Sequence, residues 1–320
     1  MPWIIGVDEA GYGPNLGPLV IAATLWKVPR KPQRVDLWSE LEGLFSATRP
    51  ESGDCVWVAD SKVVYSPAQG LLELERSILH LLALAGHRPA TSAELWRLLD
   101  GSCPCDDDGG LSTEHDPWFT GRGCPLPVAI DGLDESLCGR LMDGCRSRQI
   151  ELVSFAAQIV VPARFNRLVA EQGSKGRVLS QLTMELVDRL WPREFDEPTL
   201  VLADRHGGRA RYLEFLQPLV GDRFIRTLEE HPERSRYGVG QTEVRFQVRS
   251  EEHLPVALAS MTAKYMREVS MRLFNAYWVQ HQPGLRPTAG YPGDAMRFYT
   301  EIAPHRAALG IQDHALWRCR

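Results

Sequence analysis

Two adjacent carboxylates interrupt an apolar run near the start of the chain. Residues 3–7 (WIIGV) are apolar, which indicates a buried strand, and Asp8 and Glu9 follow directly. Because adjacent strand residues point to opposite faces, at least one of these carboxylates must be paired, hydrogen-bonded or bound to a metal ion. Gly11 and Gly13 come next and allow the backbone to approach a ligand closely. A strand that ends in a purely structural acidic turn is the alternative.

The pattern of an apolar strand that ends in an acid occurs a second time. Residues 198–203 (PTLVLA) predict a buried strand, and Asp204 follows it. A further acid, Glu268, lies on the polar side of a long helix predicted at residues 255–281. Lys264 lies four residues before Glu268, so a solvated ion pair is the alternative to a role in a site.

Carboxylates that are brought together repel each other unless a cation neutralises them. Hard divalent ions such as Mg²⁺ prefer oxygen ligands, and two ions about 4 Å apart stabilise the attacking and leaving oxygens of a phosphoryl displacement. Paired carboxylates also serve glycoside hydrolysis, which needs a sugar cleft that nothing in the sequence places around these acids. The chain has no P-loop, no G-x-S-x-G elbow and no H-E-x-x-H motif.

A sheet and a long helix are needed to bring these acids together, and the remaining sequence predicts both. Apolar and β-prone runs predict strands at residues 3–7, 19–28, 150–161, 198–203, 223–228 and 243–248, with the last two paired. Helices are predicted at residues 66–86, 133–147, 162–169, 178–191 and 255–281, the first beginning with Ser66 as N-cap and Pro67. Strands joined by helices indicate one α/β core over residues 1–320.

Residues 87–149 interrupt this pattern of strands joined by helices, and we interpret them as an insertion within the single domain. Four of their side chains could be drawn as a zinc site: Cys103, Cys105, His115 and Cys124. Their spacing fits no standard structural zinc pattern, so a surface excursion with incidental thiols is the favoured interpretation.

Composition and charge leave the class of partner open. Apolar residues make up 44% of the chain, which is ordinary for a globular protein, and the net charge is −5. That charge does not indicate a nucleic-acid binder, but local patches matter more than the total. No apolar run is long enough to span a membrane, no export signal is visible, and the seven cysteines lack framework spacing. We therefore expect a cytoplasmic protein with reduced thiols.

Several of these segments, taken in order, resemble motifs of the type 2 ribonucleases H (ribonuclease HII). Residues 6–14 (GVDEAGYGP) resemble the family signature G-x-D-E-A-G-R-G-P. Colinear likenesses are D-S-K at residues 60–62, L-V-L-A-D at residues 200–204, A-L-A-S-M-T-A-K-Y-M-R-E at residues 257–268 and G-Y at residues 290–291. The resemblance covers residues 3–86 and about 150–306, and leaves 87–149 unmatched.

The resemblance implies a ribonuclease H-like fold, a mixed five-stranded sheet flanked by helices. It also implies a metal-dependent endonuclease that hydrolyses the RNA strand of RNA–DNA hybrids, or ribonucleotides embedded in DNA, by a two-metal mechanism with Mg²⁺ or Mn²⁺. By position, the implied catalytic, metal-ligating acids are Asp8, Glu9, Asp204 and Glu268. The implied substrate-binding residues are Gly11, Tyr12, Gly13, Lys62, Lys264 and Tyr291. We expect a monomer without a membrane partner.

The departures from the family pattern affect the residues implied in substrate binding more than the implied metal-ligating acids. Tyr12 stands where the family has an arginine, which removes a phosphate contact from the loop. Glu268 stands where an aspartate is usual, and Glu251 and Glu252 place negative charge where the family has a G-D-A-K-S-like entry to the long helix. The alternative hypothesis is therefore a nucleic-acid-binding protein of the same fold that is catalytically silent or acts on another substrate.

Overall fold

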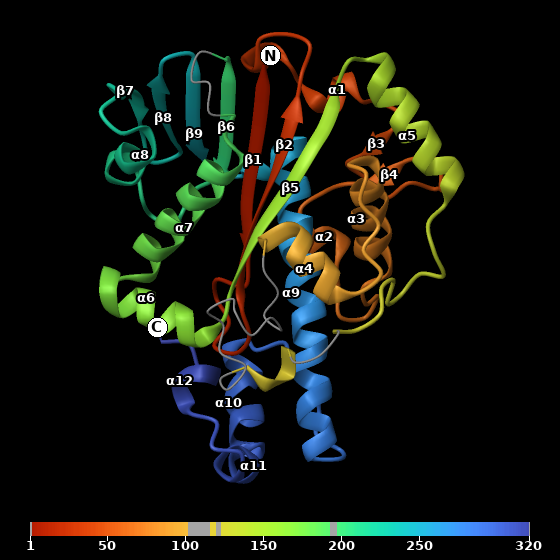
Figure 1. The fold of residues 1–320 in the computed structure, drawn as a ribbon, viewed down its shortest axis with the longest axis vertical. Helices are drawn as coiled ribbons and strands as arrows, with labels where there is room; N and C mark the ends of the chain where they lie inside the picture. Colours follow the sequence, from red (N-terminus) through yellow and green to blue (C-terminus); the bar gives the residue numbers. More distant parts are fainter. Residues whose placement is uncertain (1, 102–115, 120–122, 193–196, 320) are drawn as a thin grey trace.

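A seven-stranded mixed sheet forms the centre of the molecule, and the structure, a computed structural model, describes residues 2–101, 116–119, 123–192 and 197–319 (Figure 1). Its strands, in spatial order, are β5 (Glu151–Val160), β2 (Leu19–Lys27), β1 (Trp3–Ala10), β6 (Thr199–Asp204), β9 (Thr242–Gln247), β8 (Arg234–Val239) and β7 (Arg226–Glu230). β2 runs antiparallel to both β1 and β5, whereas β6 runs parallel to β1 and β9. The predicted α/β class is confirmed.

Two of the strands depart from the prediction. The strands expected at residues 223–228 and 243–248 do not pair with each other, because β8 lies between β7 and β9 and runs antiparallel to both. In β8, Arg234 and Arg236 alternate with the buried Ser235 and Tyr237, so the polar residues of its first half hide the strand in the sequence. The resemblance implies a five-stranded sheet and the sequence pattern predicts six strands, whereas the sheet of the described chain has seven. A separate pair, β3 (Phe45–Ser46) and β4 (Val56–Trp57), lies outside this sheet.

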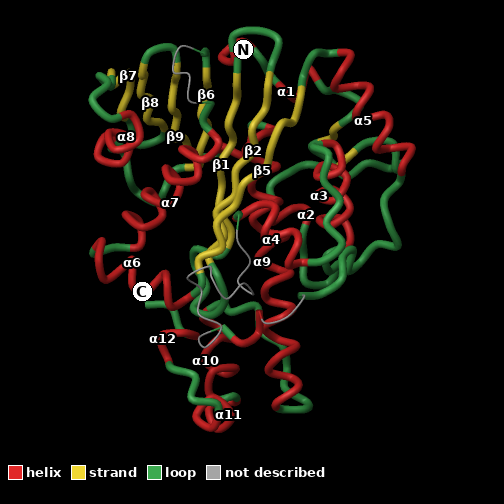
Figure 2. The backbone as a smooth tube through the Cα atoms, viewed as in Figure 1, coloured by secondary structure: helices red, strands yellow, loops and turns green. Residues whose placement is uncertain are grey.

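Helices cover both faces of the sheet, as the backbone tube shows (Figure 2). The principal helices are α3 (Leu72–Leu84), α4 (Ser92–Asp100), α5 (Glu135–Ser147), α6 (Pro162–Gln172), α7 (Lys175–Leu190), α8 (Leu213–Val220), α9 (Leu254–His281) and α10 (Pro292–Glu301). Shorter helices are α1 (Leu37–Glu40), α2 (Ser61–Val64), α11 (Ala303–Ala308) and α12 (Asp313–Leu316), with 3-10 turns η1 (Pro32–Arg34), η2 (Pro117–Phe119) and η3 (Ser250–Glu252).

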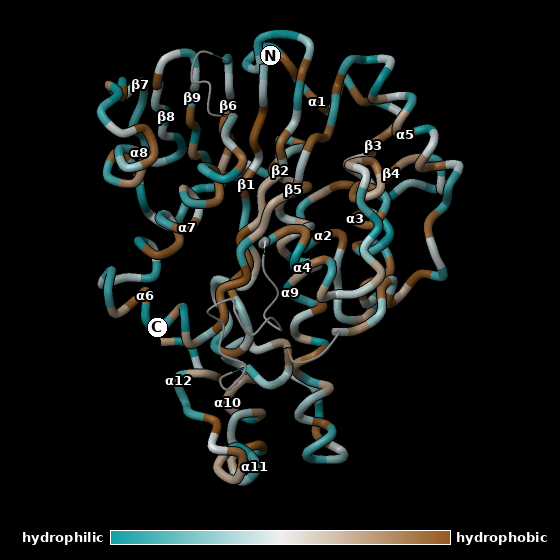
Figure 3. The backbone as a smooth tube through the Cα atoms, in the orientation of Figure 1, coloured by the Kyte–Doolittle hydropathy of each residue, from teal (hydrophilic) through white to brown (hydrophobic). Residues whose placement is uncertain are grey.

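Each face of the sheet has its own apolar core, and apolar residues concentrate along the central strands (Figure 3). The larger core joins α9 and α3 to one face, and the smaller core joins α7 and α8 to the other. The helix expected to begin at Pro67 begins instead at Leu72, because residues 66–70 form a turn closed by a hydrogen bond from the Gly70 amide to the Ser66 carbonyl. Within the described chain, no helix is long and apolar enough to cross a membrane.

The described part of residues 87–149, interpreted as an insertion, packs into the larger core through α4 and α5. Glu75, a fully buried carboxylate of α3, anchors them by accepting hydrogen bonds from the amides of residues 128–130 and from the Tyr265 hydroxyl. Cys103, Cys105 and His115 lie outside the described residues, and Cys124 is a free cysteine. The insertion and the single-domain assignment stay predictions.

The close approach of β1 to α9 depends on a glycine. A Cβ atom at Gly6 would overlap the backbone of Pro255, in the first turn of α9. Small buried residues recur on this part of α9: Ala257, Ala259, Ser260 and Ala263. This contact sets where the helix lies against the strand that carries Asp8 and Glu9.

We therefore predict that Gly6→Ala lowers the free energy of unfolding by about 1–3 kcal/mol, because backbone rather than a flexible side chain must move. Gly139→Ala, in the middle of α5 with open space around its Cβ position, is the matched control and should be neutral or stabilising by roughly 0.5–1 kcal/mol. Denaturant unfolding measures both. A Gly6→Ala protein as stable as the wild type would show that α9 is not seated this tightly.

Candidate functional site

Three acids lie together at the carboxyl ends of two neighbouring parallel strands. Val7 of β1 pairs with Ala203 of β6, so Asp8 and Asp204 follow adjacent positions in the register, and Glu9 comes next on β1. Parallel pairing brings strand ends of the same polarity to one edge of the sheet. The arrangement that the sequence predicts for Asp8, Glu9 and Asp204 is thus provided by the backbone.

Burial and mutual repulsion act on these carboxylates. Asp8 is 7% exposed, and burial followed by the charge of Glu9 raises its pKa well above the usual range, although a hydrogen bond with Ser260 acts in the opposite direction. The pKa of Glu9 is raised to about 7, first by burial and then by the charges of Asp204 and Glu251. Carboxylates with pKa values raised by like charges form a site that favours added positive charge.

Glu251, which the sequence analysis treated only as a departure from the family pattern, is part of this cluster. It lies in η3, immediately before α9, and its pKa is raised by burial and then by Asp204 and Asp60. The backbone amide of the preceding residue, Ser250, donates to the Asp204 carboxylate at 3.3 Å and ties η3 to the end of β6. The feature of the sequence that could have revealed Glu251 is the S-E-E run at residues 250–252, just before α9.

Lys62 is the cation that acts on the cluster. Its ammonium lies 3.8 Å from the carboxylate of Asp60, which also caps α2 by accepting from the Lys62 amide. Burial lowers the pKa of Lys62, but the charges of Asp60 and Glu251, with smaller effects from other acids, raise it overall. Lys62, which the resemblance implies as a substrate-binding residue, thus lies where its charge acts on Glu9.

Glu268 lies in a different environment from the other three predicted acids. One of its oxygens accepts from Lys264 at 2.6 Å and Arg267 at 3.4 Å, and the other accepts from the Tyr65 hydroxyl at 2.9 Å. Burial and then the charge of Glu268 raise the pKa of Tyr65. The alternative of an ion pair between Lys264 and Glu268 therefore describes this contact, with the pair largely buried rather than solvated.

The acids form an electrostatic cluster rather than a completed coordination shell. Within the described residues, no three His, Cys, Asp or Glu side chains are arranged so that they could hold a metal ion as they stand. The donors of Asp8, Glu9, Asp204 and Glu251 are all carboxylate oxygens, which is the chemistry that hard divalent cations select. The donor set fits such an ion. Burial first and the charges of neighbouring acids second raise the pKa values of these carboxylates, and a bound cation would offset both effects.

The glycine loop lies directly beyond these acids. Gly11 has φ +86°, and a Cβ atom there would meet the Arg267 side chain, so the loop backbone lies tightly on α9. Tyr12 is half-buried, with the Lys175 ammonium 5.8 Å from its ring. Burial and then the charge of Glu9 raise the pKa of Tyr12, which agrees with its position beside the acids. Gly13 is exposed.

Tyr291, predicted to contact the substrate sugar, lies next to the same loop. The carbonyl of Gly290 accepts hydrogen bonds from the amides of Asn15 and Leu16, which joins the two segments. The Tyr291 ring is 48% exposed and lies 5.6 Å from the Arg267 guanidinium. Of the predicted substrate residues, Gly11, Tyr12, Gly13 and Tyr291 adjoin one another, whereas Lys264 is paired with Glu268.

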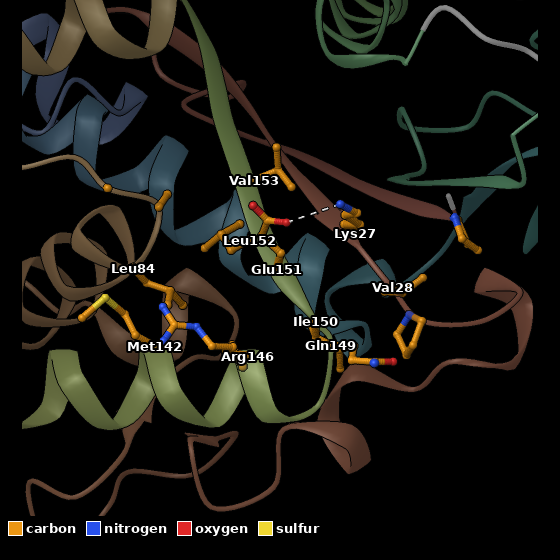
Figure 4. A pocket seen from close by; sticks show the side chains of 15 residues that line it. Lys27, Val28, Leu84, Met142, Arg146, Gln149, Ile150, Glu151, Leu152 and Val153 are labelled. Atoms are coloured by element: carbon orange, nitrogen blue, oxygen red, sulfur yellow. Dashed lines mark ion pairs between the residues drawn. The ribbon is translucent and has the colours of Figure 1, made fainter.

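The pocket of about 740 Å³ drawn in Figure 4 lies elsewhere. Its walls come from the start of β5, the end of β2, α5 and the end of α3, and the Lys27–Glu151 ion pair at 3.8 Å crosses it. None of the clustered acids lines it. This pocket is therefore not the candidate site. The candidate site is the cluster of carboxylates at the other end of β1.

Comparison with known proteins finds similarity to solved ribonucleases H. RNase HII from Archaeoglobus fulgidus, solved with PCNA, is 15% identical at a TM-score of 0.42, over 99% of this chain and 94% of that one. Ribonuclease H2 from Pyrococcus horikoshii is 14% identical at 0.43, over 98% and 92%. Bst-RNase HIII, solved with Mn²⁺, is 17% identical at 0.40, over 99% and 66%. No protein-family model and no curated protein matches the chain.

The raised pKa of Glu9 predicts that the metal-free protein loses stability as pH rises. Unfolded Glu9 releases its proton near pH 4.5, whereas folded Glu9 holds it to about pH 7, so the folded state binds more protons between these values and its stability falls there. Glu9→Gln removes this penalty. We expect the variant to be more stable than the wild type at pH 8 by on the order of 1–3 kcal/mol.

Denaturant unfolding in EDTA at pH 5 and pH 8 measures the difference, which should be smaller at pH 5. Glu151→Gln, which changes an exposed carboxylate at the opposite end of the sheet, should behave like the wild type at both pH values. A Glu9→Gln protein that is less stable than the wild type at pH 8 would contradict the repulsive cluster.

Proposed function

We propose that the protein is a divalent-metal-dependent endonuclease that hydrolyses the RNA strand of RNA–DNA hybrids, or ribonucleotides embedded in duplex DNA. The observation that carries the proposal is the cluster of Asp8, Glu9, Asp204 and Glu251, which come from two strand ends and a helix entry and act on one another's charge. Such crowding of partly buried carboxylates is costly unless a cation joins it. The substrate class rests on the resemblance of residues 6–14 and 257–268 to type 2 ribonucleases H.

Mg²⁺ or Mn²⁺ is the cofactor that the donor set suits, and Asp8, Glu9, Asp204 and Glu251 are the residues that would hold it. Bound there, the metal would supply stabilisation of the attacking and leaving oxygens of the phosphodiester. Glu251 takes the place that the sequence analysis gave to Glu268, whose oxygens are already engaged by Lys264, Arg267 and Tyr65.

The other predicted site residues would bind the nucleic-acid substrate. Lys62 places a positive charge at the edge of the acidic cluster, where it can approach a phosphate. The backbone of Gly11 and Gly13 can approach a ribose, whose 2′-hydroxyl distinguishes RNA from DNA. The exposed ring of Tyr291 adjoins the same loop and offers a surface for a sugar or a base.

A second candidate function is nucleic-acid binding without cleavage, or cleavage of a different phosphodiester. Two observations favour it: Tyr12 in the glycine loop, and the absence of a completed three-ligand group among the described side chains. Calorimetry with Mg²⁺ and Mn²⁺ separates a silent protein, which binds neither ion, from a nuclease. A panel of hybrid, single-ribonucleotide duplex, junction DNA and structured RNA then identifies the bond that is cut.

We predict that Asp8→Asn abolishes Mg²⁺- or Mn²⁺-dependent cleavage of a hybrid duplex and that Glu251→Gln lowers it by roughly 100-fold or more, because each removes a metal-binding charge. Glu268→Gln is the matched control. Provided that it folds, it should retain cleavage within about threefold, since both of its oxygens are already engaged by Lys264, Arg267 and Tyr65.

Cleavage rates on a hybrid and on a single-ribonucleotide duplex, with circular dichroism to check folding, measure these effects. Cleavage that is unchanged by Asp8→Asn would exclude the proposed site. Loss of cleavage in a folded Glu268→Gln protein, with Glu251→Gln active, would restore Glu268 as the fourth ligand.

A further inference from the structure

The segment between β6 and α9 carries an excess of positive charge. Residues 205–249 contain nine arginines, six acidic residues and no lysine, which gives a net charge of +3, whereas the whole chain carries −5. The segment forms α8, β7, β8 and β9, and its three strands continue the sheet beyond β6 (Figure 1). Arginine binds phosphate groups through two parallel hydrogen bonds. The composition of this segment therefore favours a polyanionic partner.

Five of these arginines are neutralised by acids of the same segment. Their partners are the carboxylates of Glu214, Glu229, Glu230 and Glu243, and the paired arginines are Arg209, Arg211, Arg234, Arg236 and Arg245. Among the described residues, no carboxylate lies within ion-pair distance of Arg205, Arg226 or Arg249. The charge of these three side chains is therefore available to a ligand.

Two of the three arginines lie beside the acidic cluster. Arg205 directly follows Asp204 at the carboxyl end of β6. Arg249 lies two residues beyond Gln247 at the carboxyl end of β9, which pairs with β6 in parallel. The Arg205 amide donates to the Gln247 carbonyl at 3.1 Å and so joins the two strand ends. Arg226 begins β7 at the opposite edge of the sheet, because β7 and β9 both run antiparallel to β8.

Arg249 also has an uncommon backbone conformation. Its φ is +58°, and Gln149 is the only other non-glycine residue of the described chain with a positive φ. Left-handed backbone costs free energy in a residue with a Cβ atom, and such strain concentrates at functional sites. The turn at Arg249 leads directly into Ser250, whose amide donates to Asp204, and Arg249 itself is exposed.

A cavity of about 720 Å³ lies between the β7–β8 turn and the end of β9, and Arg249 and Arg234 both line it. The strand register places this cavity next to the acidic cluster, because Gln247 pairs with Asp204 on one side and with Arg234 on the other. His231 lines the cavity as well. The cavity therefore brings cationic side chains to the edge of the sheet that carries the acids.

Negative charge is present at the same place and limits the affinity for an anion. Glu229 lines the cavity but is paired with Arg234 at 2.9 Å. Glu233 also lines it and is exposed, and within the described chain no cation forms an ion pair with it. Glu251 and Glu252 follow Arg249 in the chain, and a divalent cation bound to the acidic cluster would offset the charge of Glu251. Glu233 is therefore the acid whose removal should strengthen anion binding most.

We propose that Arg249, with Arg205 at the neighbouring strand end, binds a backbone phosphate of duplex nucleic acid at this cavity. The site lies on the side of the acidic cluster away from the glycine loop, since β1, β6 and β9 follow one another across the sheet. Neighbouring strands are about 4.8 Å apart, a distance comparable with the rise of one or two nucleotides along a duplex. That the duplex is an RNA–DNA hybrid rests on the proposed function, whereas the phosphate contact does not.

The first test measures the binding of a fluorescent RNA–DNA hybrid by anisotropy in EDTA, which prevents metal-dependent cleavage. Arg249→Met should weaken binding about tenfold at low salt and reduce the slope of log affinity against log salt concentration by about one, as expected for one phosphate contact. Glu233→Gln should tighten binding several-fold.

Arg226→Met is the matched control, because Arg226 is exposed and unpaired among the described residues but lies at the opposite edge of the sheet. Its affinity and salt slope should equal those of the wild type. Wild-type binding by Arg249→Met, or equal losses in Arg249→Met and Arg226→Met, would overturn the phosphate site. An affinity that Glu233→Gln leaves unchanged would show that the phosphate does not bind at the cavity.

The second test separates a phosphate contact from a structural role. Glycine adopts the left-handed backbone without strain, so Arg249→Gly should unfold at a temperature no lower than the wild type and yet bind the hybrid as weakly as Arg249→Met. Gln149→Gly relieves the same kind of strain beside the pocket of Figure 4 and should bind the hybrid like the wild type. An Arg249→Gly protein with lowered stability and wild-type affinity would leave Arg249 only a structural role.

The outcomes distinguish this proposal from the proposed function. A protein that cleaves hybrids, and whose hybrid affinity and salt slope are the same in Arg249→Met, would overturn the phosphate site and leave the nuclease proposal standing. A hybrid affinity that depends on Arg249, in a protein that cleaves no ribonucleotide-containing duplex with Mg²⁺ or Mn²⁺, would contradict the nuclease proposal and retain the phosphate site.

Discussion

The parallel pairing of β1 with β6 brings the acidic side chains at their carboxyl ends close together, where their negative charges repel one another. Val7 opposite Ala203 fixes where Asp8 and Asp204 fall, and no rotation of a side chain can move the two strand ends apart. The entry to α9 then adds Glu251 to the same edge, tied there by the hydrogen bond from the Ser250 amide to Asp204. The raised pKa values of these acids are the cost of that arrangement, and Lys62 offsets only part of it.

The helix α9 links the acidic cluster to the loop that follows it. Its first turn packs against Gly6, Ser260 in its second turn hydrogen-bonds with Asp8, and Arg267 near its middle lies under Gly11. One helix thus runs along β1 from the strand interior to the glycine loop and sets the position of both. Arg318, from the C-terminal segment, supports the loop as well by donating to the carbonyls of Gly11 and Pro14. The acidic cluster and the glycine loop therefore lie side by side.

The sequence was sufficient for the features that depend on local pattern. Apolar runs that end in acids located Asp8, Glu9 and Asp204, and the parallel pairing of β1 with β6 brings these positions to one edge of the sheet. Glu251 could not be found this way, because a residue in a 3-10 turn reaches the cluster only through tertiary packing. Glu268 illustrates the converse: its helix position is correctly predicted, but whether a carboxylate pairs with Lys264 or binds a metal depends on neighbours such as Tyr65 that are distant in sequence. β8 was missed because two arginines and a buried serine in its first half mask the strand pattern.

The central claim, that the cluster at the ends of β1 and β6 binds divalent cations, is tested most directly by locating Mn²⁺ through its anomalous scattering in crystals of the protein. The account predicts a Mn²⁺ peak coordinated by carboxylate oxygens of Asp8, Glu9, Asp204 or Glu251, with Glu268 still bound to Lys264. A peak at Glu268, or no peak at the ends of β1 and β6 at a saturating Mn²⁺ concentration, would contradict it.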